Sequence, residues 1–287
     1  GAATWTNGTM TGTGTTNILG GMTMSGSNAK TWTGSRTVNN GDGASAVTTS
    51  WTGGNMVANG SNNTFNNTVG ATFDISSDNG FSGGGAFTFN NAGTLTKSAG
   101  SGTTSFGGWI MGFNNTGTVN VNSGTLSIGA ANGTYNQQGG TVTGSGTINV
   151  VRMNWSGGTF SGTGALNVSG GGNTITTSGA KGLDRTLNNT GTITFTGALG
   201  AGGQIEFGVG NSTPGIINNS GTVNLSNGAS FQIANANAAH AINNSGNWNV
   251  SGSFTNTVNT GIKFNNSGTV TVANNSTFVT LGGGTQT

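Results

Sequence analysis

The stretch Ile217-Asn218-Asn219-Ser220-Gly221-Thr222-Val223-Asn224-Leu225 decides the fold of this chain, because it repeats. Each copy reads apolar residue, Asn, Asn, a small residue, Gly, and then an alternation of polar and apolar residues. The first asparagines of the six copies are Asn90, Asn114, Asn188, Asn218, Asn243 and Asn265, spaced by 24, 74, 30, 25 and 22 residues. The interval of 74 residues corresponds to about three turns of a period near 25, which indicates a repeat architecture.

A second motif fills the long interval and the N-terminal part of the chain. Each copy begins with Trp or Gln and continues with a run rich in Gly and Thr, and the copies are the segments 5–14, 51–56, 138–146 and 155–164. Both motifs place a short alternating run after small and glycine residues, so we interpret them as versions of one coil.

The alternation predicts strands that are half buried. Val119 and Val121 fall on one face of such a strand and Thr118 and Asn120 on the other, since strand side chains alternate with a period of two. A second short strand follows at 126–128, and the apolar residues before each Asn pair supply a third. Three strands per coil predict an all-β, parallel β-solenoid of roughly 11 or 12 coils, a rod of roughly 55 Å at ~4.8 Å per coil. We expect one domain over 1–287, with irregular coils at 76–112 and 196–216.

The Asn-Asn-Ser/Thr-Gly segments suit the corners of the coils. Asn and Gly tolerate left-handed backbone conformations, and Asn side chains bond to neighbouring backbone groups. Asparagines at equal positions of stacked coils also form side-chain amide ladders. The only segment of helical composition, 234–241, is expected to be a loop or a single turn.

Composition narrows the function. Only 12 of the 287 residues are Asp, Glu, Lys or Arg, and the chain has no cysteine, which excludes disulfides, thiolate metal sites and cysteine nucleophiles. The seven cations are scattered singly, so no basic face for nucleic acid is expected. No apolar run reaches the ~18 residues of a membrane span, and the segment that starts at Gly1 does not have the charged and apolar pattern of a signal segment. We expect a mature product or an excised piece.

The repeats resemble those of large secreted bacterial surface proteins of the autotransporter-passenger and filamentous-haemagglutinin kind. The residues that carry the resemblance are the Trp-Ser/Thr-Gly-Gly blocks, Gly70-Ala71-Thr72-Phe73-Asp74-Ile75 and the Asn-Asn-Ser/Thr-Gly-Thr-Val blocks. It implies a right-handed parallel β-helix with a cell-surface or matrix role, and it implies no active-site residues.

The acidic residues argue against an enzyme, although many β-helices cleave polysaccharides. A glycosidase needs two carboxylates about 5 to 10 Å apart, and the chain has only Asp42, Asp74, Asp78, Asp184 and Glu206. Asp74 and Asp78 are expected to be solvated turn residues, with a Ca²⁺ site as the alternative. Asp184 and Arg185 are expected to form a surface ion pair, and His240 is expected to be a loop residue without a catalytic partner. We predict no catalytic residue, no cofactor and no metal.

Two binding functions stay open beside a structural one. Exposed tryptophans would stack on sugars, but Trp248 occupies a slot that is valine or isoleucine in other copies, and we expect Trp5, Trp51 and Trp155 in the core as well. The outward pairs, such as Thr222/Asn224 and Thr269/Thr271, are expected to form two columns about 7 Å apart. A flat array of that kind orders water, so ice binding is the sharper alternative.

The function predicted from the sequence is a structural extracellular fibre, matrix or surface-adhesin scaffold. The alternatives are a carbohydrate- or ice-binding solenoid and, third, a polysaccharide-degrading enzyme. Expected partners are flanking repeats or further copies joined head to tail, and glycans or cell surfaces. The self-assembly prediction rests on the absence of a visible cap, because an open solenoid end exposes unpaired backbone groups.

Overall fold

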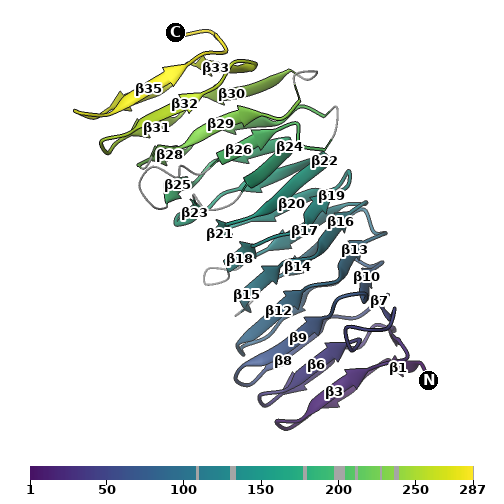
Figure 1. The fold of residues 1–287 in the computed structure, drawn as a ribbon. Helices are drawn as coiled ribbons and strands as arrows, with labels where there is room; N and C mark the ends of the chain where they lie inside the picture. The colour runs from purple at the N-terminus through teal and green to yellow at the C-terminus, as the bar shows by residue number, and fades with distance from the viewer. Residues whose placement is uncertain are drawn as a thin grey trace. The chain divides into compact units, whose positions relative to one another are not determined.

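The computed structural model describes residues 1–107, 110–129, 134–176, 180–196, 204–210, 213–226, 228–235 and 239–286. Every regular element in these ranges is a β-strand, and the strands stack in parallel as the coils of a β-solenoid of about 11 turns (Figure 1). The predicted all-β solenoid is therefore confirmed. The chain divides into two compact units, unit 1 with residues 1–136 and 140–151, and unit 2 with 137–139 and 152–287.

Unit 1 builds three parallel stacks, and each coil gives one strand to each stack. We name a stack after one of its members. The β16 stack contains β1 (Ala3–Trp5), β4 (Met22–Met24), β7 (Thr48–Trp51), β10 (Thr72–Ile75), β13 (Thr94–Lys97), β16 (Thr118–Val121) and β19 (Thr141–Thr143). The β17 stack contains β2 (Gly8–Met10), β5 (Lys30–Thr33), β8 (Met56–Asn59), β11 (Phe81–Ser82), β14 (Thr103–Phe106), β17 (Thr125–Ile128) and β20 (Thr147–Val150). The β12 stack contains β3 (Thr15–Ile18), β6 (Thr37–Asn40), β9 (Asn63–Asn67), β12 (Phe87–Asn91) and β15 (Ile110–Asn115), and β18 (Thr134–Gln137) lies at the unit boundary.

Unit 2 also builds three parallel stacks, two of which share the long strands β22 (Gly158–Val168) and β24 (Ala180–Asn189). The β29 stack continues the first halves of these strands with β26 (Gln204–Phe207), β29 (Ser230–Ile233), β32 (Thr255–Val258) and β35 (Thr277–Thr280). The β27 stack continues the second halves with β27 (Ile216–Asn219), β30 (His240–Asn244) and β33 (Ile262–Asn266). The β28 stack contains β21 (Met153–Trp155), β23 (Asn173–Thr176), β25 (Thr192–Thr196), β28 (Thr222–Leu225), β31 (Asn247–Val250) and β34 (Thr269–Val272).

The predicted inward and outward faces are confirmed. Val119 and Val121 are buried, while Thr118 and Asn120 alternate with them on the outside of β16. In unit 2, Val223 pairs in register with Ile193 on one side and with Trp248 on the other, so a tryptophan fills the slot of a valine. Phe195 also points inward, in the neighbouring column, where it pairs with Leu225. Aromatic rings add to the core of unit 1, where Phe89 stacks on Phe65 with ring centroids 5.2 Å apart.

The repeat changes its place in the coil between β22 and β24. The segment Leu187–Asn189 belongs to an Asn-Asn motif, yet it pairs in register with Leu166–Val168, which ends a Trp-Gly-Gly motif. Counting from Asn114 in β15, strands β18, β21 and β23 each complete one further coil. Asn188 then lies in the second half of β24, two strand positions after β23. The interval of 74 residues therefore spans three coils and two more strands, which is longer than the three turns expected from its length.

The corner glycines of the Asn-Asn motif have a different role from the one expected. Gly191, Gly221, Gly246 and Gly268 are not among the residues with positive φ, so a left-handed conformation does not explain them. A Cβ on Gly221 would overlap the carbonyl oxygen of Gly191 in the coil before it, and the same clash recurs at Gly246 and Gly268. Glycine is required here because neighbouring coils approach each other closely. Glycines of the second motif do adopt the left-handed conformation: Gly54 has a φ of 69° and Gly158 a φ of 80°.

The last coil is covered on one of its three strands, contrary to the expectation of a bare end. The segment 282–286 runs beside β33, where Phe264 N–H donates to Gly283 O at 2.9 Å and Asn266 N–H to Thr285 O at 2.7 Å. Thr285 N–H also donates to Asn265 Oδ1 at 3.2 Å. The other two strands of this coil are not covered in the same way. Val272, at the end of β34, is 45% exposed, and Leu281, directly after β35, is 55% exposed.

The two segments predicted to be irregular are described in part. Within 76–112, strand β11 has only two residues, and the register between β12 and β15 shifts between Phe87 and Thr88. Within 196–216, residues 197–203 and 211–212 lie outside the described residues. Segment 234–241 contains the start of β30 at His240, and its residues 236–238 also lie outside the described residues.

Candidate functional site

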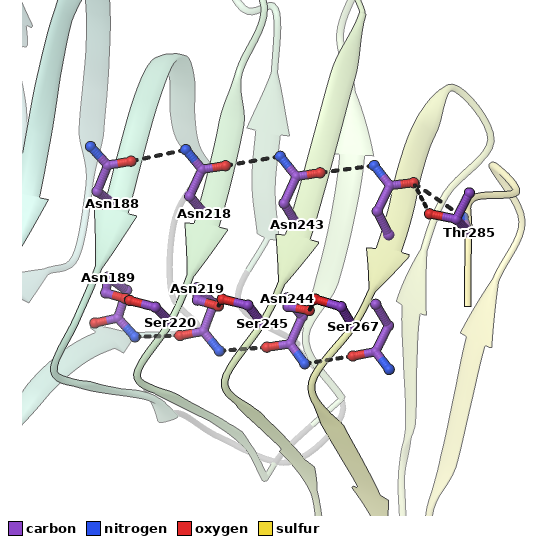
Figure 2. A pocket seen from close by; sticks show the side chains of 12 residues that line it. Asn188, Asn189, Asn218, Asn219, Ser220, Asn243, Asn244, Ser245, Ser267 and Thr285 are labelled. Carbon is purple, nitrogen blue, oxygen red and sulfur yellow. Dashed lines mark hydrogen bonds between the residues drawn. The ribbon is translucent and has the colours of Figure 1, made fainter. Parts of the chain in front are cut away.

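Two rows of asparagine side chains run across the coils of unit 2, and Figure 2 shows both. They come from the two successive asparagines of the motif on β24, β27, β30 and β33. Because side chains of a strand alternate, the first asparagine points outward and the second inward. The outer row is Asn188, Asn218, Asn243 and Asn265, and the inner row is Asn189, Asn219, Asn244 and Asn266.

The inner row joins each corner to the next coil. Asn219 Nδ2 donates to Asn244 Oδ1 at 2.6 Å and to Asn247 O at 3.0 Å, and Asn219 Oδ1 accepts from Asn189 Nδ2 at 2.7 Å. Asn189 and Asn219 are buried. Buried amides need such partners because an unsatisfied polar group costs about 1 to 3 kcal/mol. The predicted amide ladder is confirmed, and unit 1 repeats it through Asn40, Asn67, Asn91 and Asn115.

The outer row forms a second ladder of opposite polarity. Asn218 Nδ2 donates back to Asn188 Oδ1 at 2.9 Å, and Asn243 Nδ2 donates back to Asn218 Oδ1 at 2.8 Å. A carboxamide has two N–H donors and two acceptor lone pairs. At Asn218 and Asn243 the ladder uses one of each, so these half-buried side chains keep one further donor and one further acceptor. At Asn265 the side-chain oxygen accepts from Thr285 N–H and from Thr285 Oγ1, so only a donor is left there.

A column of serines completes a groove beside the outer row. Ser220, Ser245 and Ser267 are exposed at the corners, and their hydroxyls donate to the inner-row carbonyls, as Ser245 Oγ does to Asn219 O at 3.2 Å. This donation leaves the lone pairs of each hydroxyl as acceptors. The groove encloses about 490 Å³, and only Asn, Ser and Thr side chains line it. It is therefore polar, uncharged and repetitive.

Four of the five carboxylates have local structural partners. Asp42 Oδ1 accepts the N–H groups of Ala44 and Ser45, both at 2.9 Å, which lower the pKa of this carboxyl. Glu206 accepts from Gln204 Nε2 at 2.6 Å, and Asp74 faces outward on β10. Among the described residues, no group of three or more His, Asp or Glu side chains is placed to hold a metal.

Asp78 is exposed outside the strands, as expected, and forms an ion pair with a buried lysine, whereas Asp74 lies on strand β10 and not in a turn. Lys97 Nζ contacts Asp78 Oδ1 at 2.8 Å and also donates to Ser77 O and Ala99 O, both at 3.1 Å. Lys97 is fully buried and stands in register between Ile75 and Val121, so it occupies a core position. The hydrogen bond from Lys97 lowers the pKa of Asp78.

Two more lysines are buried, although the sequence suggests scattered surface charges. Lys30 Nζ donates to the carbonyls of Gly53 at 2.6 Å and Asn28 at 3.1 Å, and burial lowers its pKa. Burial lowers the pKa of Lys181 to about 8. The ammonium group of lysine has three N–H donors and no acceptor, so it needs only acceptors as partners. The backbone carbonyl groups of the corners supply them for an inward lysine such as Lys30.

Asp184 and His240 are also buried, which corrects the expected surface ion pair and loop histidine. Asp184 accepts Val209 N–H and Gly210 N–H, both at 2.8 Å, one on each carboxylate oxygen. His240 lies on β30, where Nδ1 accepts Gly215 N–H at 3.1 Å and Nε2 lies 2.9 Å from Asn235 O. Since Nδ1 accepts, Nε2 carries the proton. Asp184 therefore holds the backbone at Val209 and Gly210, and His240 holds it at Gly215, directly before β27.

The tryptophans form no sugar-stacking platform in the described chain. Trp51, Trp155 and Trp248 are fully buried and Trp5 is 8% exposed, as expected for core residues. Trp109 lies outside the described residues. A carbohydrate function would therefore rest on polar groups.

The outward Thr and Asn pairs form the expected columns. In unit 2, Thr222 and Asn224 stand in register with Asn247 and Asn249 of the next coil. In unit 1, one column consists of threonines alone, over Thr48, Thr72, Thr94, Thr118 and Thr141. Coils of different length differ at their corners and not in these strands, so the columns stay aligned.

Sequence reasoning found the two asparagine rows but missed the groove. The signal is the small residue after each Asn pair, which is Ser in the last three copies and Ala92, Thr116 or Thr190 in the earlier ones. Three consecutive serines line the groove.

Comparison with protein-family models, with curated proteins and with solved structures gives no match. In the described part of the chain, no helix has the length and apolar character to cross a membrane.

Proposed function

We propose that this chain is a structural scaffold, a segment of an extracellular fibre, matrix or surface adhesin. The observation that carries the proposal is the pair of amide ladders, because the most regular side chains of the repeat bond one coil to the next. Four of the five carboxylates, Asp42, Asp78, Asp184 and Glu206, likewise accept hydrogen bonds from groups within the fold.

The surface supports the same function. Outward positions are mainly Thr, Asn and Ser, and charge is scarce, so neighbouring copies or flanking repeats meet little electrostatic repulsion. The half-exposed Val272 and Leu281 next to β34 and β35 offer apolar surface on which a further coil would pack. The partner that we propose is another repeat of the same kind, in the same or in another molecule.

Immunogold labelling of intact cells that produce the protein tests the proposal. We expect label on the outer surface or on extracellular fibres, and no turnover of polysaccharides by the purified chain. Label confined to the cytosol would contradict the scaffold, and so would glycan cleavage at substoichiometric protein.

Ice binding is a second candidate, favoured by the unbroken column of five threonines in unit 1. Stacked strands space these side chains ~4.8 Å apart, with a second polar column about 7 Å away along the strand. Asp74 interrupts that second column with a charge. An ice-recrystallisation assay on the purified chain decides between this function and an inert surface.

A further inference from the structure

We infer that the groove of unit 2 between the outer asparagine row and the serine column binds a neutral polysaccharide chain. The site is lined by Asn218, Asn243 and Asn265 on one side and by Ser220, Ser245 and Ser267 on the other. This inference does not depend on the scaffold function, because it concerns a surface that is complete within consecutive coils of unit 2.

The hydrogen-bonding capacity of the groove matches hydroxyl groups. Asn218 and Asn243 each have one donor and one acceptor left over from the ladder, and each serine has acceptor lone pairs left over from its bond to the corner carbonyl. Asn265 has a donor left, because its oxygen accepts from Thr285. A sugar hydroxyl both donates and accepts, so adjacent hydroxyls of one sugar match the free donor and acceptors of one rung.

The repetition of the groove indicates a polymer as the ligand. The full rung recurs at Asn218/Ser220 and Asn243/Ser245, and Asn265/Ser267 continues it with a donor but without a free amide oxygen. Stacked strands place the rungs ~4.8 Å apart, which is close to the length of one sugar unit in an extended chain. A chain bound at several rungs gains affinity over a single sugar because the later contacts are intramolecular.

The charge of the groove selects a neutral polymer. Every lining residue is Asn, Ser or Thr, so no cation is present among them to pair with an acidic sugar. Lys263 is exposed on β33, two residues before Asn265, and it is the lysine that an acidic glycan would engage. Binding to the groove alone is therefore expected to be insensitive to salt.

The test is an NMR titration of the ¹⁵N-labelled chain with cellohexaose and with maltohexaose, following the side-chain amide signals of Asn218 and Asn243. We expect saturable shifts of these signals with at least one of the two sugars, equal at low and high NaCl. Ser245→Trp fills the groove at an exposed position and is expected to weaken binding by about tenfold or more, a loss of about 1.4 kcal/mol. A triple variant, Ser220→Ala with Ser245→Ala and Ser267→Ala, removes the acceptors without adding bulk and is expected to act in the same direction.

Thr116→Trp is the matched control, because Thr116 is exposed at the same slot of the motif in unit 1. It imposes a similar change on a corner and is expected to bind like the unchanged protein. The inference is overturned if neither sugar shifts the two amide signals, if Thr116→Trp weakens binding as much as Ser245→Trp, or if NaCl abolishes binding. None of these results would affect the scaffold proposal, which the labelling experiment tests separately.

Discussion

Single inward positions of this solenoid accept lysine as readily as valine, because the corners supply acceptors. Lys97 stands in a column with Ile75 and Val121, and its ammonium group reaches corner carbonyls and Asp78. Lys181 stands between Gly158 and Ile205, also in an inward column. The sequence does not identify such lysines as core residues, since it shows the alternation of a strand but not whether a long side chain finds partners at its far end.

The lowered pKa of Lys181 predicts that stability rises with pH. Its pKa is about 8 in the folded chain against 10.5 ordinarily, so between these values the unfolded chain binds a proton that the folded chain does not. The free energy of unfolding therefore increases with pH through this window. We expect a gain of about 1 to 2 kcal/mol between pH 7.5 and 9.5 from urea unfolding. Lys181→Met should remove this gain, apart from a smaller rise in the same direction from Lys30.

Lys263→Met serves as the control for the pH experiment, because Lys263 is exposed on β33. This variant should keep the full pH dependence. If Lys181→Met and the unchanged protein gain the same stability over this range, Lys181 is not the group responsible.

At the scale of the element, buried inner-row asparagines and half-exposed asparagines of outward faces have different energetic roles. An inner-row asparagine is hydrogen-bonded to both neighbouring coils, while an asparagine on an outward face is half exposed and has water as an alternative partner. The inner row should therefore dominate the stability of the corners.

Exchanging Asn219 for Ala tests this difference. It removes the donor to Asn244 Oδ1 and the acceptor of Asn189 Nδ2, and both groups stay buried. We expect a loss of about 2 to 4 kcal/mol in urea unfolding. Asn249→Ala deletes a hydrogen bond of 3.0 Å from Asn249 Nδ2 to Asn224 Oδ1 on a half-exposed face, and it should cost less than about 1 kcal/mol. Equal losses would show that burial does not separate the inner row from the half-exposed amides of an outward face.

The strands and their faces were predictable from sequence, whereas the placement of the repeats within the coil was not. Alternation alone identifies Val119 and Val223 as inward residues. The change of position between β22 and β24 leaves no such signal, because Leu166-Asn167-Val168 and Leu187-Asn188-Asn189 differ mainly in the last residue. The groove depends on that placement as well as on three serines in consecutive copies, so it emerges only when the coils are stacked.

At the scale of the whole chain, a solenoid differs from a globular domain in how far a local defect spreads. Each coil bonds to the coil before and the coil after it, so stability is nearly a sum of coil and neighbour contributions. The chain also divides into two compact units. A defect in one unit should therefore leave distant coils of the other unit folded.

Val223→Asp provides the defect. Val223 is 2% exposed between Ile193 and Trp248, and burial of valine stabilises by roughly 1.5 to 3 kcal/mol, to which the buried charge adds. Hydrogen exchange followed by mass spectrometry should show lost protection in β25, β28 and β31, while β9, β12 and β15 of unit 1 keep theirs. Thr222→Ser, one residue away on the outward face, should leave both units protected. Loss of protection along the whole chain in Val223→Asp would instead mean that the coils unfold as one cooperative body, and equal effects of the two variants would contradict the register of β28.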